Sequence, residues 1–128
     1  MSRQRLLLVA LVSLLAMPAF AQKFTAAIRG TVNDPTDAPI SGAKVTLANE
    51  DTGVSRIVTT NPSGAYSFPD LPVGSYRVEV ESPGFKTFVQ TKVLINVADV
   101  REVNVKLETG AVTEMVSVEA NPNAVKTV

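Results

Sequence analysis

The sequence predicts an all-β protein: a seven- to eight-stranded Greek-key β-sandwich preceded by a helical signal peptide. Apolar residues recur with a period of two from Ala26 onward, which is typical of half-buried strands. Turns rich in proline and glycine interrupt these runs every eight to twelve residues, the spacing expected of a sandwich. The part of the chain after residue 21 is long enough for one domain.

The first 21 residues have the layout of a secretory signal peptide. Two arginines open the chain, an apolar run spans Leu6–Phe20, and Ala19-Phe20-Ala21 offers small residues at both positions of an A-x-A cleavage site. A membrane anchor is the alternative, but a spanning helix needs about 20 apolar residues and this run is shorter and contains Pro18. We therefore expect cleavage after Ala21 and an exported protein.

The first three strands of the exported chain are separated by turns with proline or glycine. They are expected at 28–32, 43–50 and 56–60, the last with an ambiguous inward face. The first two alternate clearly, with inward positions at Ile28, Gly30, Val32, Val45 and Leu47. The turns between them place proline early and glycine late, which suits the dihedral preferences of both residues.

The next stretch, GAYSFPDLPVGSYRVEV at 64–80, contains the pattern Gly-x-Tyr-x-apolar twice. Because a turn precedes each copy, the pattern predicts a β-hairpin in which the second residue of each strand is an inward tyrosine. A binding role for the tyrosines is the alternative. The residues assigned to this turn and core framework, including the glycine of the following turn, are Gly64, Tyr66, Phe68, Gly74, Tyr76 and Gly84.

Two further strands are expected at 94–97 and 103–108. Ile95 and Val97 are predicted to face inward in the first of these strands. The second alternates apolar with polar residues, and its predicted inward residues are Val103, Val105 and Leu107.

The composition argues against an enzyme. The chain has no His, Cys or Trp, which removes Ser-His-Asp and Cys-His nucleophiles and zinc held by histidine or cysteine. We expect no catalytic residue, cofactor or metal. Calcium at Asp34 and Asp37, or at Glu50 and Asp51, is a weak alternative because these residues lie in turns and calcium needs six or more oxygen ligands. A net charge of zero without a basic patch argues against nucleic acid as a partner.

Residues 30–87 resemble the carboxypeptidase regulatory-like domain. GTVND at 30–34 followed by PISGAKV at 39–45 resembles its opening. TNPSGAYSF at 60–68 resembles the pattern T-D-x-x-G-x-Y-x-F, with Asn61 in place of the usual aspartate. LPVGSY at 71–76 resembles L-x-P-G-x-Y, with its proline and glycine one residue apart instead of adjacent, and SPGF matches the next turn.

The resemblance implies a seven-stranded, transthyretin-like (prealbumin-like) sandwich without the catalytic residues of carboxypeptidases. Similar domains occur at the secreted N-terminus of TonB-dependent outer-membrane receptors. The fold is also grouped with carbohydrate-binding folds, which is a weak guide to activity.

The C-terminal stretch resembles the TonB box of such receptors, a short extended segment of the pattern D-T-x-x-V-x-A. The β-pattern itself favours the last strand of the sandwich, with Val116 and Val118 inward, because such eight-residue patterns are common in any sandwich. Both interpretations hold if a partner captures an edge strand. We therefore expect a sandwich over 22–110, followed at 111–128 by a last strand or TonB-box-like segment and a linker. The predicted partner-binding residues are Thr113, Glu114, Met115, Val116, Ser117, Val118, Glu119 and Ala120.

The sequence thus predicts a non-catalytic, secreted interaction module, either the N-terminal accessory domain of a TonB-dependent receptor or a fragment of one. Its expected partner is a TonB-like protein or the remainder of a receptor, in the periplasm or outer membrane. The main alternative is a carbohydrate-binding module, for which Phe88 is the best candidate for an exposed ring. A Lys–Asn isopeptide bond is a third hypothesis, but the first strand offers Arg29 where a lysine is needed.

Overall fold

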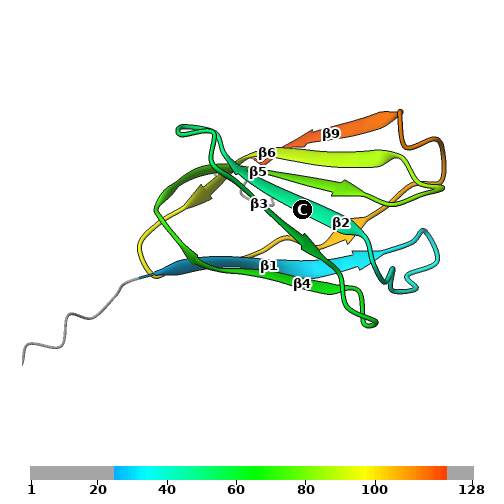
Figure 1. The fold of residues 1–128 in the computed structure, drawn as a ribbon, viewed down its shortest axis with the longest axis horizontal. Helices are drawn as coiled ribbons and strands as arrows, with labels where there is room; N and C mark the ends of the chain where they lie inside the picture. Colours follow the sequence, from blue (N-terminus) through cyan, green and yellow to red (C-terminus); the bar gives the residue numbers. More distant parts are fainter. Residues whose placement is uncertain (1–24, 121–128) are drawn as a thin grey trace, which may run out of the picture.

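The computed structural model describes residues 25–120, which form two β-sheets packed face to face (Figure 1). The predicted signal peptide and residues 121–128 lie outside this range. In the described stretch, no helix is long and apolar enough to cross a membrane.

The smaller sheet is built around the first strand. β1 (Ala26–Asn33) pairs antiparallel with β4 (Ala65–Leu71) along one edge. Along its other edge, β1 pairs parallel with β7 (Val100–Glu102) and then with β8 (Val105–Lys106). Because β7 and β8 follow one edge in succession, this sheet is only three strands wide.

The larger sheet contains five strands in the order β3-β2-β5-β6-β9. β2 and β5 are central, β3 forms one edge and β9 forms the other (Figure 1). All pairings are antiparallel except β6 with β9, which is parallel. The strands are β2 (Lys44–Asn49), β3 (Ser55–Thr59), β5 (Gly74–Glu81), β6 (Thr87–Ile95) and β9 (Met115–Glu119).

The core lies between the sheets and is made by alternate residues of their strands, as the period of two requires. The prediction of an all-β sandwich is confirmed. The largest fully buried side chains are Phe68, Ile28, Leu47, Leu107, Val32, Val45, Val78, Val80 and Val93.

The predicted hairpin at 64–80 is wrong. β4 pairs with β1 in the smaller sheet, whereas β5 pairs with β2 and β6 in the larger one. The connection at Pro72-Val73 is therefore a corner between sheets, and the two tyrosines enter the core from opposite sides. Arg56 stabilises the corner by donating to the backbone carbonyls of Pro69 and Asp70.

The strand predicted at 94–97 is also misplaced. β6 begins at Thr87 and ends at Ile95, and Val97 lies beyond it with 62% of its surface exposed. A β-bulge explains the error, since the pairing shifts between Val78–Gln90 and Tyr76–Val93. The shift puts the two halves of β6 out of phase, so 87–95 shows no continuous period of two.

Candidate protein-binding edge

The predicted partner-binding segment forms the outermost strand of the larger sheet. β9 pairs in register with β6, from Met115 opposite Thr87 to Glu119 opposite Thr91. Backbone hydrogen bonds bracket the pairing, from the Thr87 N–H to the Glu114 carbonyl at 2.8 Å and from the Ala120 N–H to the Thr91 carbonyl at 3.0 Å. Even-numbered residues of β9 thus turn their backbone groups toward β6, and odd-numbered residues turn theirs to the free edge.

The side chains of β9 are poorly covered. Val116 and Val118 lie opposite Phe88 and Gln90, on the face that points toward the smaller sheet. However, that sheet is three strands wide and β9 is the fifth strand of its own sheet, so little lies over it. Val116 is half-buried, Val118 is 42% exposed and Met115 on the other face is 60% exposed. Both valines therefore point toward the smaller sheet, as predicted, but the side chain of Val118 remains exposed to solvent.

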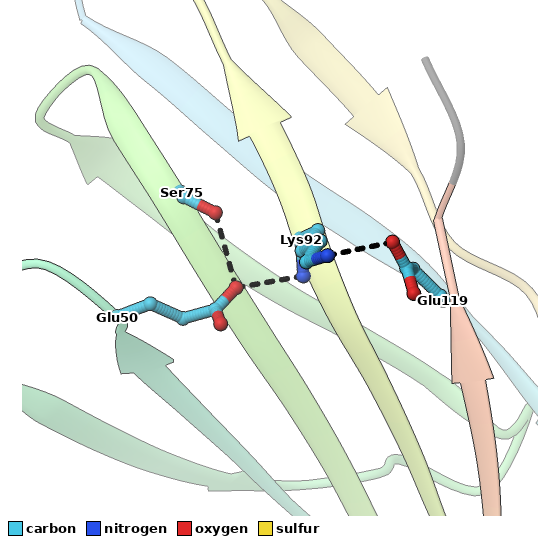
Figure 2. Close-up of polar contacts among 4 residues, drawn as sticks. All are labelled: Glu50, Ser75, Lys92 and Glu119. Atoms are coloured by element: carbon cyan, nitrogen blue, oxygen red, sulfur yellow. Dashed lines mark hydrogen bonds and ion pairs between the residues drawn. The ribbon is translucent and has the colours of Figure 1, made fainter. Parts of the chain in front are cut away.

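A polar cluster formed by Glu50, Ser75, Lys92 and Glu119 crosses the end of this sheet (Figure 2). Lys92 occupies the β-bulge with a φ of 56°, a left-handed conformation that few non-glycine residues adopt. The Glu50 carboxylate accepts the Lys92 N–H at 2.7 Å and the Ser75 hydroxyl at 3.0 Å. It thereby satisfies a backbone donor that the bulge removes from the ladder.

The side chain of the bulge residue contacts the edge strand. The Lys92 Nζ lies 2.7 Å from a carboxylate oxygen of Glu119 (Figure 2). The hydrogen bond and charge of Glu119 raise the pKa of Lys92 above its ordinary value, so the amine is charged at neutral pH. Both side chains are exposed, so solvent screens the pair.

The start of β9 is held by a second set of polar contacts. Lys86 Nζ lies 3.5 Å from a carboxylate oxygen of Glu114 and 3.8 Å from one of Glu108. The Thr87 hydroxyl donates to the Val112 carbonyl at 2.7 Å. The edge strand is therefore fixed at both ends by polar side chains of β6 and its preceding turn, and only weakly by apolar contacts.

The turn and core residues proposed from the sequence lie apart from this edge. Tyr66, Phe68 and Tyr76 are buried, and the Tyr76 hydroxyl donates to the Pro72 carbonyl at 2.7 Å. Gly64 and Gly84 have positive φ values in their turns, and Gly74 lies at the start of β5. These residues build the sandwich and form no common site.

One structural contact was not predicted from the sequence. The Tyr66 hydroxyl donates to the backbone carbonyl of Val103, which lies between β7 and β8. Burial raises the pKa of the Tyr66 phenol, which favours the protonated donor. A Cβ on Gly30 would lie 1.8 Å from the same carbonyl oxygen, so the contact requires glycine there. The only hint in the sequence was a glycine at an inward position of a strand.

The acidic turns do not converge on a cation site within residues 25–120. The Asp34 carboxylate accepts hydrogen bonds from Thr36 and the Ala38 N–H, which lower its pKa, and Asp37 pairs with Lys106 at 2.9 Å. Glu50 serves the β-bulge instead. No group of three acidic, histidine or cysteine side chains in the described part of the chain could hold a metal ion.

A pocket of about 270 Å³ opens at one end of the sandwich. Its lining includes the buried residues Leu47, Leu71 and Tyr76 and the exposed residues Val54 and Val73. It is largely apolar and displays no exposed aromatic ring. Sequence reasoning did not find it, because its walls come from both sheets.

Comparisons with known sequences give a matching family model and several individual relatives. A model of the carboxypeptidase regulatory-like domain matches residues 27–108. The TonB-dependent transporter Oar of Myxococcus xanthus is 31% identical over 105 residues, which cover 81% of this chain and 10% of the transporter. Serine-aspartate repeat-containing protein D of Staphylococcus aureus is 46% identical over 52 residues, which cover 41% of this chain and 4% of that protein. The chain thus spans a small part of these relatives.

Solved structures share the fold at low sequence identity. The streptococcal ancillary pilin superposes with a TM-score of 0.55 and 16% identity, over 70% of this chain and 34% of the pilin. At this identity the similarity shows the sandwich architecture alone. The family model, which matches most of the chain, shows more: the chain belongs to the carboxypeptidase regulatory-like domain family.

Proposed function

We propose that the protein is a non-catalytic interaction module of the cell envelope, the accessory domain of a TonB-dependent outer-membrane receptor. Its partner-binding element is the segment from Thr113 to Ala120. The observation that carries this proposal is the position of the TonB-box-like sequence, which forms an exposed edge strand whose odd-numbered residues offer free backbone groups. Similarity to the transporter Oar across 81% of the chain supports it.

The chemistry of an edge strand fits a protein partner. A strand that pairs on one side only can add to the sheet of another protein, with affinity from the main chain and specificity from alternate side chains. Met115 and Val118 are exposed apolar residues that could enter pockets of a partner. The partner we infer is the C-terminal domain of a TonB-like protein.

Calorimetric titration of the chain from Gln22 onward with the C-terminal domain of TonB from the same organism tests this function. We expect saturable binding that Ser117→Pro abolishes, because proline removes the backbone N–H of Ser117 on the free edge. Ser117→Ala is the matched control and should bind like the native chain. Absence of binding by the native chain, or equal binding by the proline variant, would contradict the proposal.

The inferred location can be tested in cells. An antibody against residues 22–128 should detect a band much larger than 13.6 kDa in the outer-membrane fraction, as expected for the front of a receptor. A small soluble band in the periplasm or medium would show instead a stand-alone module.

Carbohydrate binding has less support. Sugar-binding sites of this kind use exposed aromatic rings, and each tyrosine and phenylalanine within residues 25–120 is buried or half-buried, Phe88 included. A glycan array with a reproducible hit would restore this alternative.

A further inference from the structure

We propose that β9 is a releasable strand. It leaves the edge of β6 as a unit while the rest of the sandwich stays folded, and the ion pair between Lys92 and Glu119 controls how often it does so. This inference rests on the proposed function for its biological meaning, because the released strand would be the form that a partner captures.

The core of the sandwich does not depend on β9. Along the described chain, the last buried core residue is Leu107, and no residue of β9 belongs to the buried cluster. Val116 is half-buried, and Ala120 just after the strand packs only partly against the core. Detaching β9 therefore exposes Val116 and part of the facing β6 residues Phe88 and Val89, but removes no residue of the core cluster. Segments with few buried contacts open well below the global unfolding free energy.

The connection to β9 allows such movement. Residues 111–114 are all exposed, and one backbone hydrogen bond within them, from Glu114 N–H to the Ala111 carbonyl, shapes their turn. Thr87 provides the hydrogen bonds from the sheet, through its N–H to the Glu114 carbonyl and its hydroxyl to the Val112 carbonyl. The chain before them is anchored separately, because the Lys86 N–H donates to the Glu108 carbonyl and Phe85 forms a bridge with Thr109. The strand can therefore swing out from about Gly110 without disturbing β8.

The β-bulge provides the contact that holds the end of β9, the ion pair between Lys92 and Glu119, which we call the latch. Lys92 has a left-handed backbone conformation in the bulge, and its side chain reaches β9, where its amine contacts Glu119 (Figure 2). Glu50 holds the bulge from the other side through the Lys92 N–H. The groups that face Lys92 are thus two carboxylates, one fixing its backbone and the other its amine, and only the second belongs to the movable strand.

Exposed ion pairs of this kind are weak, which suits a latch. Each ion pair changes the equilibrium between docked and released β9 by a small factor, and salt screens it. Lys86 adds two longer contacts at the other end of the strand. Together with the short parallel ladder, these contacts keep β9 docked most of the time and still let it open.

Native-state hydrogen exchange tests whether β9 opens separately. The Ala120 and Thr87 amides both report on the β6–β9 ladder, and the Val80 amide in central β5 reports on the core. We expect the two ladder amides to exchange on the order of a hundredfold faster than Val80, with little dependence on denaturant. Exchange of all three amides at one rate with one denaturant dependence would overturn the proposal.

Variants of the ion pair test the latch. Lys92→Met and Glu119→Gln should each speed exchange of the Ala120 amide about threefold, and the reversed pair Lys92→Glu with Glu119→Lys should restore the native rate. Lys106→Met is the matched control, because it removes an ion pair of 2.9 Å in the smaller sheet and should leave the Ala120 rate unchanged. An unchanged rate in both single variants would overturn the role of Lys92.

The same variants distinguish the release of β9 from the binding of a TonB-like partner. If the strand must be released for capture, Lys92→Met should bind the TonB C-terminal domain about threefold more tightly than the native chain. Binding by the native chain without separate opening of β9 would overturn release and support addition to the docked strand. Separate opening without any TonB binding would support release and contradict the function.

Discussion

Gly30 is fixed by a backbone contact from a distant part of the chain. The carbonyl of Val103 lies against its Cα and accepts the hydroxyl of Tyr66, so the three residues tie β1, β4 and the β7–β8 connection together. The sequence placed Gly30 and Tyr66 inward correctly. It could not reveal why glycine is needed, because the carbonyl comes from a residue more than seventy positions away.

Gly30→Ala should destabilise the sandwich strongly. Its Cβ would meet a backbone oxygen at 1.8 Å and the Tyr66 hydroxyl at 3.0 Å, so backbone must move, at a cost of about 3 kcal/mol. Gly84→Ala is the control, since its φ of +83° is strained but its surroundings are open, and it should cost about 1 kcal/mol. Urea denaturation measures both, and equal losses would contradict the close contact.

Tyr66→Phe should cost about 2 kcal/mol, because it leaves the Val103 carbonyl without its donor. The variant should also change the alkaline response. Burial raises the pKa of Tyr66 in the folded state, so its contribution is complete below the usual tyrosine pKa near 10 and is lost as pH rises above it. Urea titrations from pH 8 to 11 should show a steeper loss of stability in the native chain than in Tyr66→Phe. Parallel profiles would contradict this assignment.

At the scale of the elements, the turns were easier to predict than the pairing of the strands. The Asn61 side chain accepts hydrogen bonds from the N–H groups of Ser63 and Ala65 at 3.0 and 2.9 Å, so the turn before β4 is encoded locally. The sequence near a turn does not determine whether the two strands that it joins pair with each other or belong to opposite sheets. A two-residue connection such as Pro72-Val73 fits both arrangements, and the contact of Arg56 with Pro69 and Asp70 that stabilises the corner spans thirteen or more residues.

Asn61→Ala should cost about 1 kcal/mol in unfolding free energy, since it removes the one side-chain oxygen that accepts both hydrogen bonds of the turn. Asn61→Asp retains a side-chain oxygen at the same place and should stay within about 0.5 kcal/mol of the native chain. Thermal unfolding of the pair measures the difference. A loss in the aspartate variant as large as in the alanine variant would show that the turn does not depend on this oxygen.

Across the whole molecule, the sequence predicted the two-layer architecture and a last strand or TonB-box-like segment at 111–128, and it missed the polar cluster that holds that segment. Alternating valines identify strands wherever one face is buried, which explains the success over most of the sandwich. The bulge at Lys92 interrupts that alternation, and its partners Glu50 and Glu119 lie far away in sequence. Such a cluster becomes visible only when the four strands β2, β5, β6 and β9 lie side by side.

A chain that ends after Val112 should still fold. It lacks β9, whose only half-buried side chain is Val116, so we expect a loss of about 1.5 kcal/mol and a cooperative transition like that of the native chain. Circular dichroism during thermal unfolding measures this. Loss of the cooperative transition would mean that β9 is an integral part of the sandwich.

Residue-resolved NMR titration shows which residues of the chain contact a TonB-like partner. The ¹⁵N-labelled chain from Gln22 onward is titrated with the unlabelled C-terminal domain of TonB from the same organism. We expect saturable shifts confined to Thr113–Ala120 and to the facing β6 residues Thr87–Lys92. A spectrum that does not change, or shifts centred on the opposite edge at β3, would contradict the claim that this segment is the partner-binding strand.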